Sequence, residues 1–272
     1  MKIGTAGVPN CSKDRSTIGG IKTIRDIGLD AMEVQFVRGV RMNREKAKEV
    51  KKVSEDLNVK LSVHAPYFIN LNAERKDKIE ASLKRLRDTI LIGGIFAKNI
   101  VFHPGYYLKS SKEKAYERIR CNLKLIVEFI EDKGIDVILR PETTGKPTQF
   151  GELDEILKLC EDLNILPCID FSHIHARTMA MNSYDEFCSI LERIEEKIGK
   201  EALRNMHMHV SGIEYGLKGE KRHLNLKQSD FKYEDLLRAL RDFKVEGTLI
   251  VESPNLEEDA LMLKDLWNKL IS

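Results

Sequence analysis

Seven residues of metal-binding type stand at or just beyond the ends of short apolar segments in this 272-residue chain. The segments read KLSVHAPY, NIVFHPG, DVILRPETT, PCIDFSH, MHMHVSG and LIVESP, and they supply His64, His103, Glu142, Asp170 with His173, His209 and Glu252. Charged side chains at the ends of buried strands are costly unless something binds them, and a metal ion supplies the missing positive charge. The pattern therefore predicts a metal site.

The types of ligand indicate which metal and which chemistry. Imidazole and carboxylate ligands without cysteine suit Zn²⁺, and also Mn²⁺ or Fe²⁺. A catalytic zinc takes about three protein ligands, so the set is too large for one ion. Two or three neighbouring ions can generate hydroxide and stabilise the attacking and leaving oxygens of a phosphoryl transfer.

Eight short segments rich in Val, Ile and Leu alternate with longer amphipathic segments. Buried parallel strands covered by helices have this composition, and eight such units without a second block of strands favour a closed (β/α)₈ TIM barrel, an α/β fold, over an open sheet. We expect a single domain over residues 1–272. The expected strands are Lys2–Thr5, Ala31–Phe36, Lys60–His64, Asn99–His103, Asp136–Pro141, Leu166–Phe171, Asn205–Val210 and Thr248–Glu252, and the clearest helices are Arg75–Ile95, Ser111–Lys133, Ser183–Ile198 and Leu256–Leu270.

Active sites of such barrels lie at the C-terminal ends of the strands, which is where the candidate ligands stand. His207 precedes His209 by two residues and is expected one layer deeper, in the core. His175 is expected in a loop, without a direct role. His223 lies in a long charged segment, Gly212 to Asp230, that we expect to be a loop able to close the site from above.

Composition narrows the class of protein. The chain is 42% hydrophobic and 32% charged, as expected of a soluble globular enzyme, and a net charge of +2 does not by itself indicate a nucleic-acid-binding protein. The five cysteines form no close pair and are expected to be free thiols of a reducing compartment. No apolar run suits a membrane span or a signal peptide, so we expect a cytoplasmic monomer.

The motifs HAPYFINL, FHPG, PETT, CIDFSHIHA, HVSG and VESP together resemble the endonuclease IV family of apurinic/apyrimidinic (AP) endonucleases, which are xylose isomerase-like barrels. The resemblance implies a DNA-repair hydrolase that cleaves the backbone of double-stranded DNA 5′ to abasic sites by zinc-activated hydroxide. It also implies a catalytic role for Glu142, which would bridge two ions and orient the nucleophile. The ligand sets it implies are His64, His103 and Glu142 for one zinc, Glu142, Asp170, His209 and Glu252 for a second, and His173 with His223 for a third.

The third set departs from the family pattern. The family's Asp-x-His motif here reads Lys221-Arg222-His223, and Glu220 is the candidate replacement for the missing aspartate. Two zinc ions are thus provided for, the third depends on this replacement, and Mn²⁺ is the alternative metal. Glu142-Thr143-Thr144 and an opening GTAGVP also differ from the usual motifs, which indicates a divergent, archaeal-type branch.

The resemblance also suggests DNA contacts. Tyr67 follows the His-Ala-Pro motif at a family position that fills the space of the missing base. Arg38 and Arg41 follow the second strand, in the loop where the family enters the duplex. Ordinary packing for Tyr67 and solvated charges for the arginines are the alternatives.

Two other functions stay open. A sugar isomerase or epimerase of the xylose isomerase-like barrels would use one divalent ion held by Glu142, Asp170, His209 and Glu252. A DNA-damage-binding protein without catalysis is suggested by the lysine at position 221. The number of bound ions separates the isomerase from the nuclease.

Overall fold

The computed structural model describes all 272 residues and shows a closed barrel of parallel strands. The eight strands pair in the order β6-β4-β3-β2-β1-β12-β9-β8, and a parallel bridge between Glu142 and Cys168 links β6 to β8. The expected α/β barrel is confirmed. The barrel strands are β1 Lys2–Ala6, β2 Ala31–Gln35, β3 Lys60–His64, β4 Asn99–Phe102, β6 Ile138–Pro141, β8 Cys168–Asp170, β9 Met206–Val210 and β12 Gly247–Val251.

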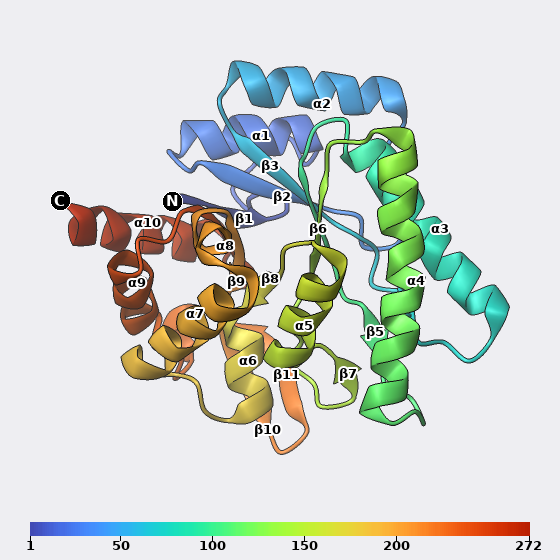
Figure 1. Cartoon of the computed structure of the whole chain (residues 1–272). Helices are drawn as coiled ribbons and strands as arrows, with labels where there is room; N and C mark the ends of the chain where they lie inside the picture. Colours follow the sequence, from blue (N-terminus) through green and yellow to red (C-terminus); the bar gives the residue numbers. More distant parts are fainter.

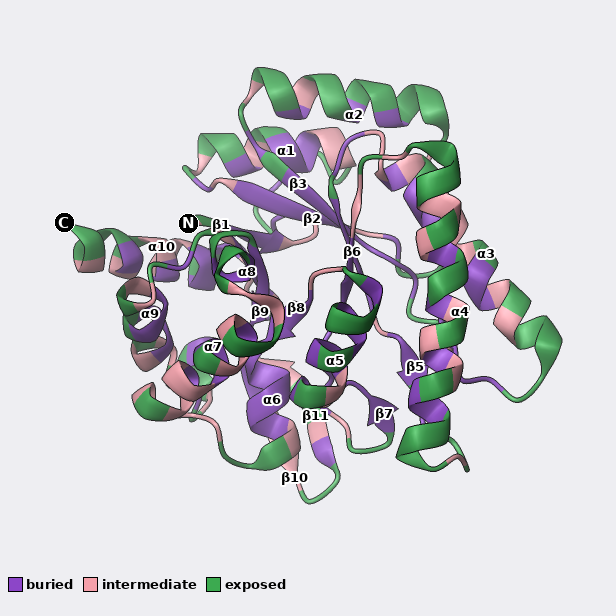
Figure 2. Cartoon of the chain, viewed as in Figure 1, coloured by how far each residue is buried: buried purple, intermediate pink, exposed green.

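Helices surround the strands, and Figure 1 shows α1 and α2 along one side, α3 and α4 along a second, and α9 and α10 along a third. Their inner faces are buried and their outer faces exposed, as Figure 2 shows for α4. Ser111 caps α4 by accepting from the amide of Lys114, and Gly134 ends it with a φ of 59°. The helices are α1 Thr17–Asp26, α2 Arg44–Asp56, α3 Lys76–Gly93, α4 Lys112–Lys133, α5 Leu153–Leu163, α6 Phe171–Thr178, α7 Tyr184–Ile198, α8 Lys200–Arg204, α9 Tyr233–Asp242 and α10 Glu257–Ile271, with a 3₁₀ turn, η1, at Leu226–Gln228.

Two segments at the C-terminal end of the barrel differ from expectation. The segment after β9 is not a loop but a hairpin of β10 (Gly212–Gly216) and β11 (Gly219–Leu224). The sixth barrel strand stops at Asp170, because that side chain accepts from the amide of His173 and caps α6. His173 and His175 therefore lie on a buried helix rather than in a loop (Figure 2). A shorter pair, β5 (Gly105–Tyr106) with β7 (Gln149–Phe150), completes this end.

The interior of the barrel holds polar side chains beneath the expected site. Ser62 and His207 both contact Glu33 there, and all three are almost wholly buried. Arg140 donates hydrogen bonds to the side chain of Asn99 and to backbone carbonyls, which ties strands across the barrel. None of the helices has the combination of length and apolarity that crossing a bilayer requires.

Candidate metal centre

Glu142 is the centre of the candidate site. It follows β6, its side chain is 1% exposed, and one oxygen, Oε2, lies 3.1 Å from Nε2 of both His64 and His103. These two histidines follow or end neighbouring strands, β3 and β4, so the barrel brings their rings to 5.3 Å between centroids. The ligand atoms of the three residues lie within 4.8 Å of one another, close enough to hold one ion.

A second group of ligand atoms meets the other oxygen of Glu142. Nδ1 of His209 lies 3.4 Å from Glu142 Oε1 and 3.5 Å from Glu252 Oε1, and Asp170 joins Glu142 and Glu252 within 4.8 Å. Glu142 Oε1, Asp170 Oδ2 and His209 Nδ1 are buried and have no hydrogen-bond partner. Such orphaned buried atoms are rare, and bound cations would supply the partners that they lack. The residues present thus fit a metal ion.

The third group comes from α6 and the β10–β11 hairpin. Glu220 lies 3.7 Å from Nε2 of His173 and 3.8 Å from Nε2 of His223, and the three form a cluster that could hold an ion. Lys221 takes no part, since its ammonium faces Glu214 at 3.4 Å. A Cβ at Gly145 would lie 2.7 Å from that of Glu220, so glycine is needed for the hairpin to approach.

A β-bulge explains how Glu220 replaces the expected aspartate. Glu214 pairs with Arg222 and Tyr215 pairs with Glu220, which leaves Lys221 as the extra residue of β11. In a regular strand, residues two apart share a face, whereas residues three apart do not. Because Lys221 is an extra residue in β11, the alternation of side chains shifts by one position there. Glu220 and His223, which are three residues apart, therefore lie on the same face of the hairpin.

Backbone carbonyls fix the orientation of three imidazoles. Nδ1 of His64 donates to the carbonyl of Ala65, that of His173 to Thr143, and that of His223 to Glu252. Because a carbonyl only accepts, Nδ1 carries a proton in each ring, and Nε2 is the nitrogen that would offer a lone pair to a metal ion once the ring is neutral. Metal-binding histidines are commonly held in this way.

The charges of the metal-free site depend on one another. Burial would raise the pKa of Glu142, but the imidazoles of His103 and His209 hold this pKa well below its usual range. Burial would lower the pKa of His173, but the carboxylates of Asp170 and Glu142 raise it well above its usual value. Burial raises the pKa of Asp170. Protons on imidazoles thus balance the carboxylates, and a cation would displace them.

Glu33 was not predicted from the sequence as part of the site. It lies in the middle of β2, is fully buried, and Oε2 accepts from Nε2 of His207 at 2.8 Å and from Ser62 at 2.8 Å. Its other oxygen, Oε1, lies 3.1 Å from Nε2 of His209. Burial lowers the pKa of His207 to about 4, so this ring is neutral. Glu33 therefore stands directly behind a candidate ligand.

The predicted DNA contacts lie in two places. The ring of Tyr67 is 5.5 Å from that of His64 and lines the metal pocket, a cavity of about 290 Å³. Arg38 and Arg41 lie apart from it, in a groove of about 560 Å³ that also contains Arg15 and Lys46. His175 packs away from the pocket, with Nε2 3.2 Å from Asp230.

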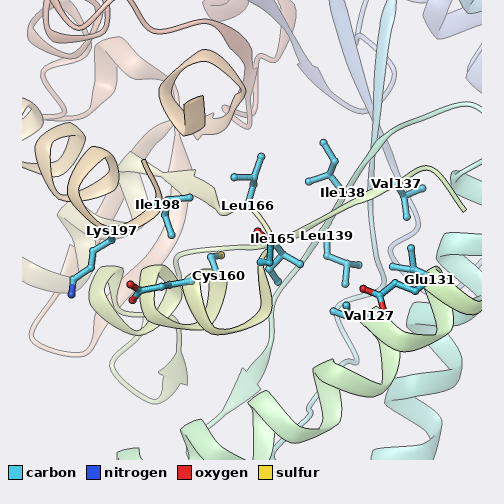
Figure 3. Close-up of a pocket in the computed structure, with 13 residues that line it drawn as sticks. Val127, Glu131, Val137, Ile138, Leu139, Cys160, Ile165, Leu166, Lys197 and Ile198 are labelled. Atoms are coloured by element: carbon cyan, nitrogen blue, oxygen red, sulfur yellow. The ribbon is translucent and has the colours of Figure 1, made fainter. Parts of the chain in front are cut away.

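Another pocket, of about 550 Å³, shares none of these residues. It lies among α4, α5 and the strand segments before Arg140 and Pro167, and Figure 3 shows its aliphatic lining, including Val137, Leu139 and Ile165. Neither a histidine nor an aspartate lines it, so it carries none of the candidate chemistry.

The chain has relatives of similar sequence among known proteins. The chain is 51% identical to the uncharacterized protein MJ0133 of Methanocaldococcus jannaschii, over 98% of this chain and 97% of that protein. It is 25% identical to a protein of Aquifex aeolicus named "probable endonuclease 4", over 84% and 83% of the two chains.

Solved structures show the same fold. The crystal structure of endonuclease IV from Thermus thermophilus matches with a TM-score of 0.73 and 19% identity, over 98% of both chains. A D-tagatose 3-epimerase-like protein matches with a TM-score of 0.76 and 21% identity, over 100% of this chain and 97% of that chain. The sequence profile described as "Xylose isomerase-like TIM barrel" matches residues 21–268, and the chain therefore belongs to this family.

Proposed function

We propose that this protein is a metal-dependent endonuclease that hydrolyses the DNA backbone 5′ to abasic sites. The observation that carries the proposal is the presence of three adjoining ligand sets around Glu142 and His173. In a sugar isomerase that binds one ion, His64, His103 and His223 would have no metal to bind. Several ions held side by side suit phosphodiester hydrolysis.

Each residue has a defined part in this proposal. Bound zinc or manganese ions would activate water and stabilise the charge that develops on the phosphate oxygens. Glu142 contacts the first set through Oε2 and the second through Oε1, so it would fix the spacing of two bound ions and could orient an attacking water. Asp170 and Glu252 balance charge at the second position. His173, Glu220 and His223 form the third.

The DNA contacts extend from this centre. Tyr67 is 46% exposed although it packs on His64, so its ring can occupy the space left by a missing base. Arg38 and Arg41 share their groove with Arg15 and with Lys46, whose ammonium lies 2.9 Å from Glu49, and present cations to backbone phosphates. The likeness to proteins named endonuclease 4 supports this substrate.

A nicking assay with metal analysis tests the proposal. The zinc-loaded protein should contain two or three ions per chain and cut a duplex 5′ to a tetrahydrofuran abasic analogue, while leaving the undamaged duplex intact. Glu142→Gln should abolish cutting, whereas Leu217→Ala, at a residue that is 89% exposed, should not affect it. Protein that keeps its ions and does not cut the abasic duplex would disprove the proposal.

A sugar isomerase or epimerase with one divalent ion is the second candidate. The ligand atoms of Glu142, Asp170 and Glu252 lie within 4.8 Å of one another together with His173, and Nδ1 of His209 lies 3.4 Å from Glu142 and 3.5 Å from Glu252, so this region could serve a single ion. One Mn²⁺ or Mg²⁺ per chain, with ketose epimerisation and no nicking, would support it. The lysine at position 221 is no argument for a DNA-binding protein that has lost catalysis. Its ammonium faces Glu214, away from the metal pocket.

A further inference from the structure

Exposed apolar side chains gather beside the metal pocket. Phe68 is 65% exposed, Tyr106 39% and Leu108 53%, and all three line one open groove of about 510 Å³, which we call the aromatic groove. Large apolar groups that cluster on a surface usually mark a binding site, because their exposure to water is unfavourable. Nothing in the chemistry at Glu142 requires them.

The aromatic groove is held rigidly from beneath. The buried side chain of Asn72 donates to the backbone carbonyls of Tyr106 and Tyr107, both at 2.9 Å. Asn70 accepts from the amides of Tyr106 and Asn72. These hydrogen bonds join the segment after β3 to the segment after β4. Leu108 keeps a φ of 55°, a strained conformation for leucine that the surrounding structure must impose.

The charge on the rim of the aromatic groove favours an anionic partner. Lys78 and Arg85 line it, and no carboxylate lies within ion-pair distance of either. Arg75 is engaged by Asp77 at 2.8 Å, and Glu74 is the single acidic residue of the lining. The two free cations can therefore meet phosphates without giving up a partner.

The aromatic groove and the metal pocket are continuous. Tyr67 and Tyr106 line both of them. A monosaccharide is small enough to bind within the metal pocket of about 290 Å³ alone and would not need the aromatic groove. A polymer that passes through the metal pocket would continue into it. Aromatic faces with nearby cations are the combination that binds unpaired nucleotides.

We propose that Phe68, Tyr106 and Leu108 form a stacking platform for unpaired nucleotides of the DNA strand that leaves the metal pocket, and that Lys78 and Arg85 bind their phosphates. This inference rests on the proposed function, whose substrate it specifies. The strand next to the abasic site is bound with its bases unstacked. Abasic sites in single-stranded or locally melted DNA are accordingly substrates of this protein.

Binding to an undamaged oligonucleotide tests the platform separately from cleavage. The probe is a single-stranded 12-mer that carries 2-aminopurine, measured with the metal-loaded protein by fluorescence and anisotropy. Stacking should quench 2-aminopurine. Phe68→Ala and Tyr106→Ala should each raise Kd by about tenfold or more, in keeping with typical base–aromatic stacking, and Phe68→Trp should restore binding. Leu217→Ala is the matched control, since it removes an exposed apolar side chain from the hairpin turn.

The cations give a second measurement. Lys78→Gln and Arg85→Gln should each reduce the slope of log Kd against log salt by about 0.7, the value for one phosphate contact with a single strand. Oligonucleotide affinity that is unchanged within twofold in Phe68→Ala and Tyr106→Ala would overturn the inference, even if the protein nicks abasic duplexes. Ring-dependent binding by a protein that does not nick would uphold the platform and overturn the reaction.

Discussion

Replacing Glu33 by glutamine should weaken metal binding without removing any ligand. The side chain of Asn99 donates to Nδ1 of His207 at 3.4 Å, so the proton of His207 lies on Nε2 and points at Glu33 Oε2. Ser62 donates to the same oxygen. The glutamine oxygen should take this position, because an NH₂ group there would face the two donors, whereas Gln35, which donates to Oε1 at 3.1 Å, can turn its amide to present its oxygen instead. Its NH₂ group then faces Nε2 of His209.

That arrangement reverses the tautomer of His209. With Glu33, the negative oxygen Oε1 lies 3.1 Å from Nε2 of His209 and favours a proton on that nitrogen, which leaves the lone pair of Nδ1 for the second ligand set. With glutamine, the amide NH₂ favours a lone pair on Nε2 and therefore a proton on Nδ1, the atom proposed to bind the metal. Losing a carboxylate behind a ligating histidine typically costs 10–100-fold in metal affinity. This corresponds to about 1.4–2.7 kcal/mol.

Zinc titration against a competing chelator measures the effect, with the three sites resolved by stoichiometry. One ion should bind 10–100-fold more weakly in Glu33→Gln, while the others keep their affinity. Ser62→Ala is the matched control, since it removes one hydrogen bond from Oε2 but leaves the charge facing His209. A folded Glu33→Gln variant that binds every ion as tightly as the natural protein would refute the tautomer argument.

Three further predictions concern the third ligand set and the charge of the site. Gly145→Ala should release one ion and leave the others, because its Cβ would overlap Glu220; a variant that keeps all its ions in elemental analysis would contradict this. Deletion of Lys221 should keep the full number of ions, because Glu220 and the following histidine would then lie two residues apart on one face of a regular strand; loss of an ion would count against the bulge argument. Without metal, melting temperature should fall as pH rises from about 6.5, since the raised pKa values of His173 and His209 stabilise the fold only while both rings are protonated. With zinc present the trend should reverse, because deprotonation then favours metal binding.

The barrel could be predicted because its strands carry a strong and simple signal. Most are short apolar runs that end at or just before a polar residue, and β3 begins and ends at the residues expected. The strand ends also place His64, His103 and Glu142 together, as the shared geometry of parallel strands requires. The sequence pattern does not predict how these residues would bind a metal, because residue spacing does not show which ring nitrogen of a histidine faces the site.

Features that depend on local competition could not be predicted. From the sequence, Asp170 could equally be the last residue of a strand or the N-cap of a helix. The structure shows that it is an N-cap, because its side chain accepts a hydrogen bond from the amide of His173. The hairpin after β9 carries many charges, which hid its alternating pattern. Glu33 stands inside a strand, whereas the active-site residues of a barrel are expected at the strand ends. The signal was nonetheless present, because a glutamate within the buried run Ala31–Gln35 needs a partner.

The third ligand set shows how a departure from a motif can be compensated by backbone structure. A family pattern read by position alone finds a lysine where an aspartate is expected and predicts a lost site. The bulge at Lys221 changes which residues share a face, so the adjacent glutamate reaches His173 and His223 instead. Glutamate is one methylene longer than aspartate, and Gly145 leaves the space for it. The substituted residue, the inserted residue and the glycine opposite them therefore have to be judged together as one site.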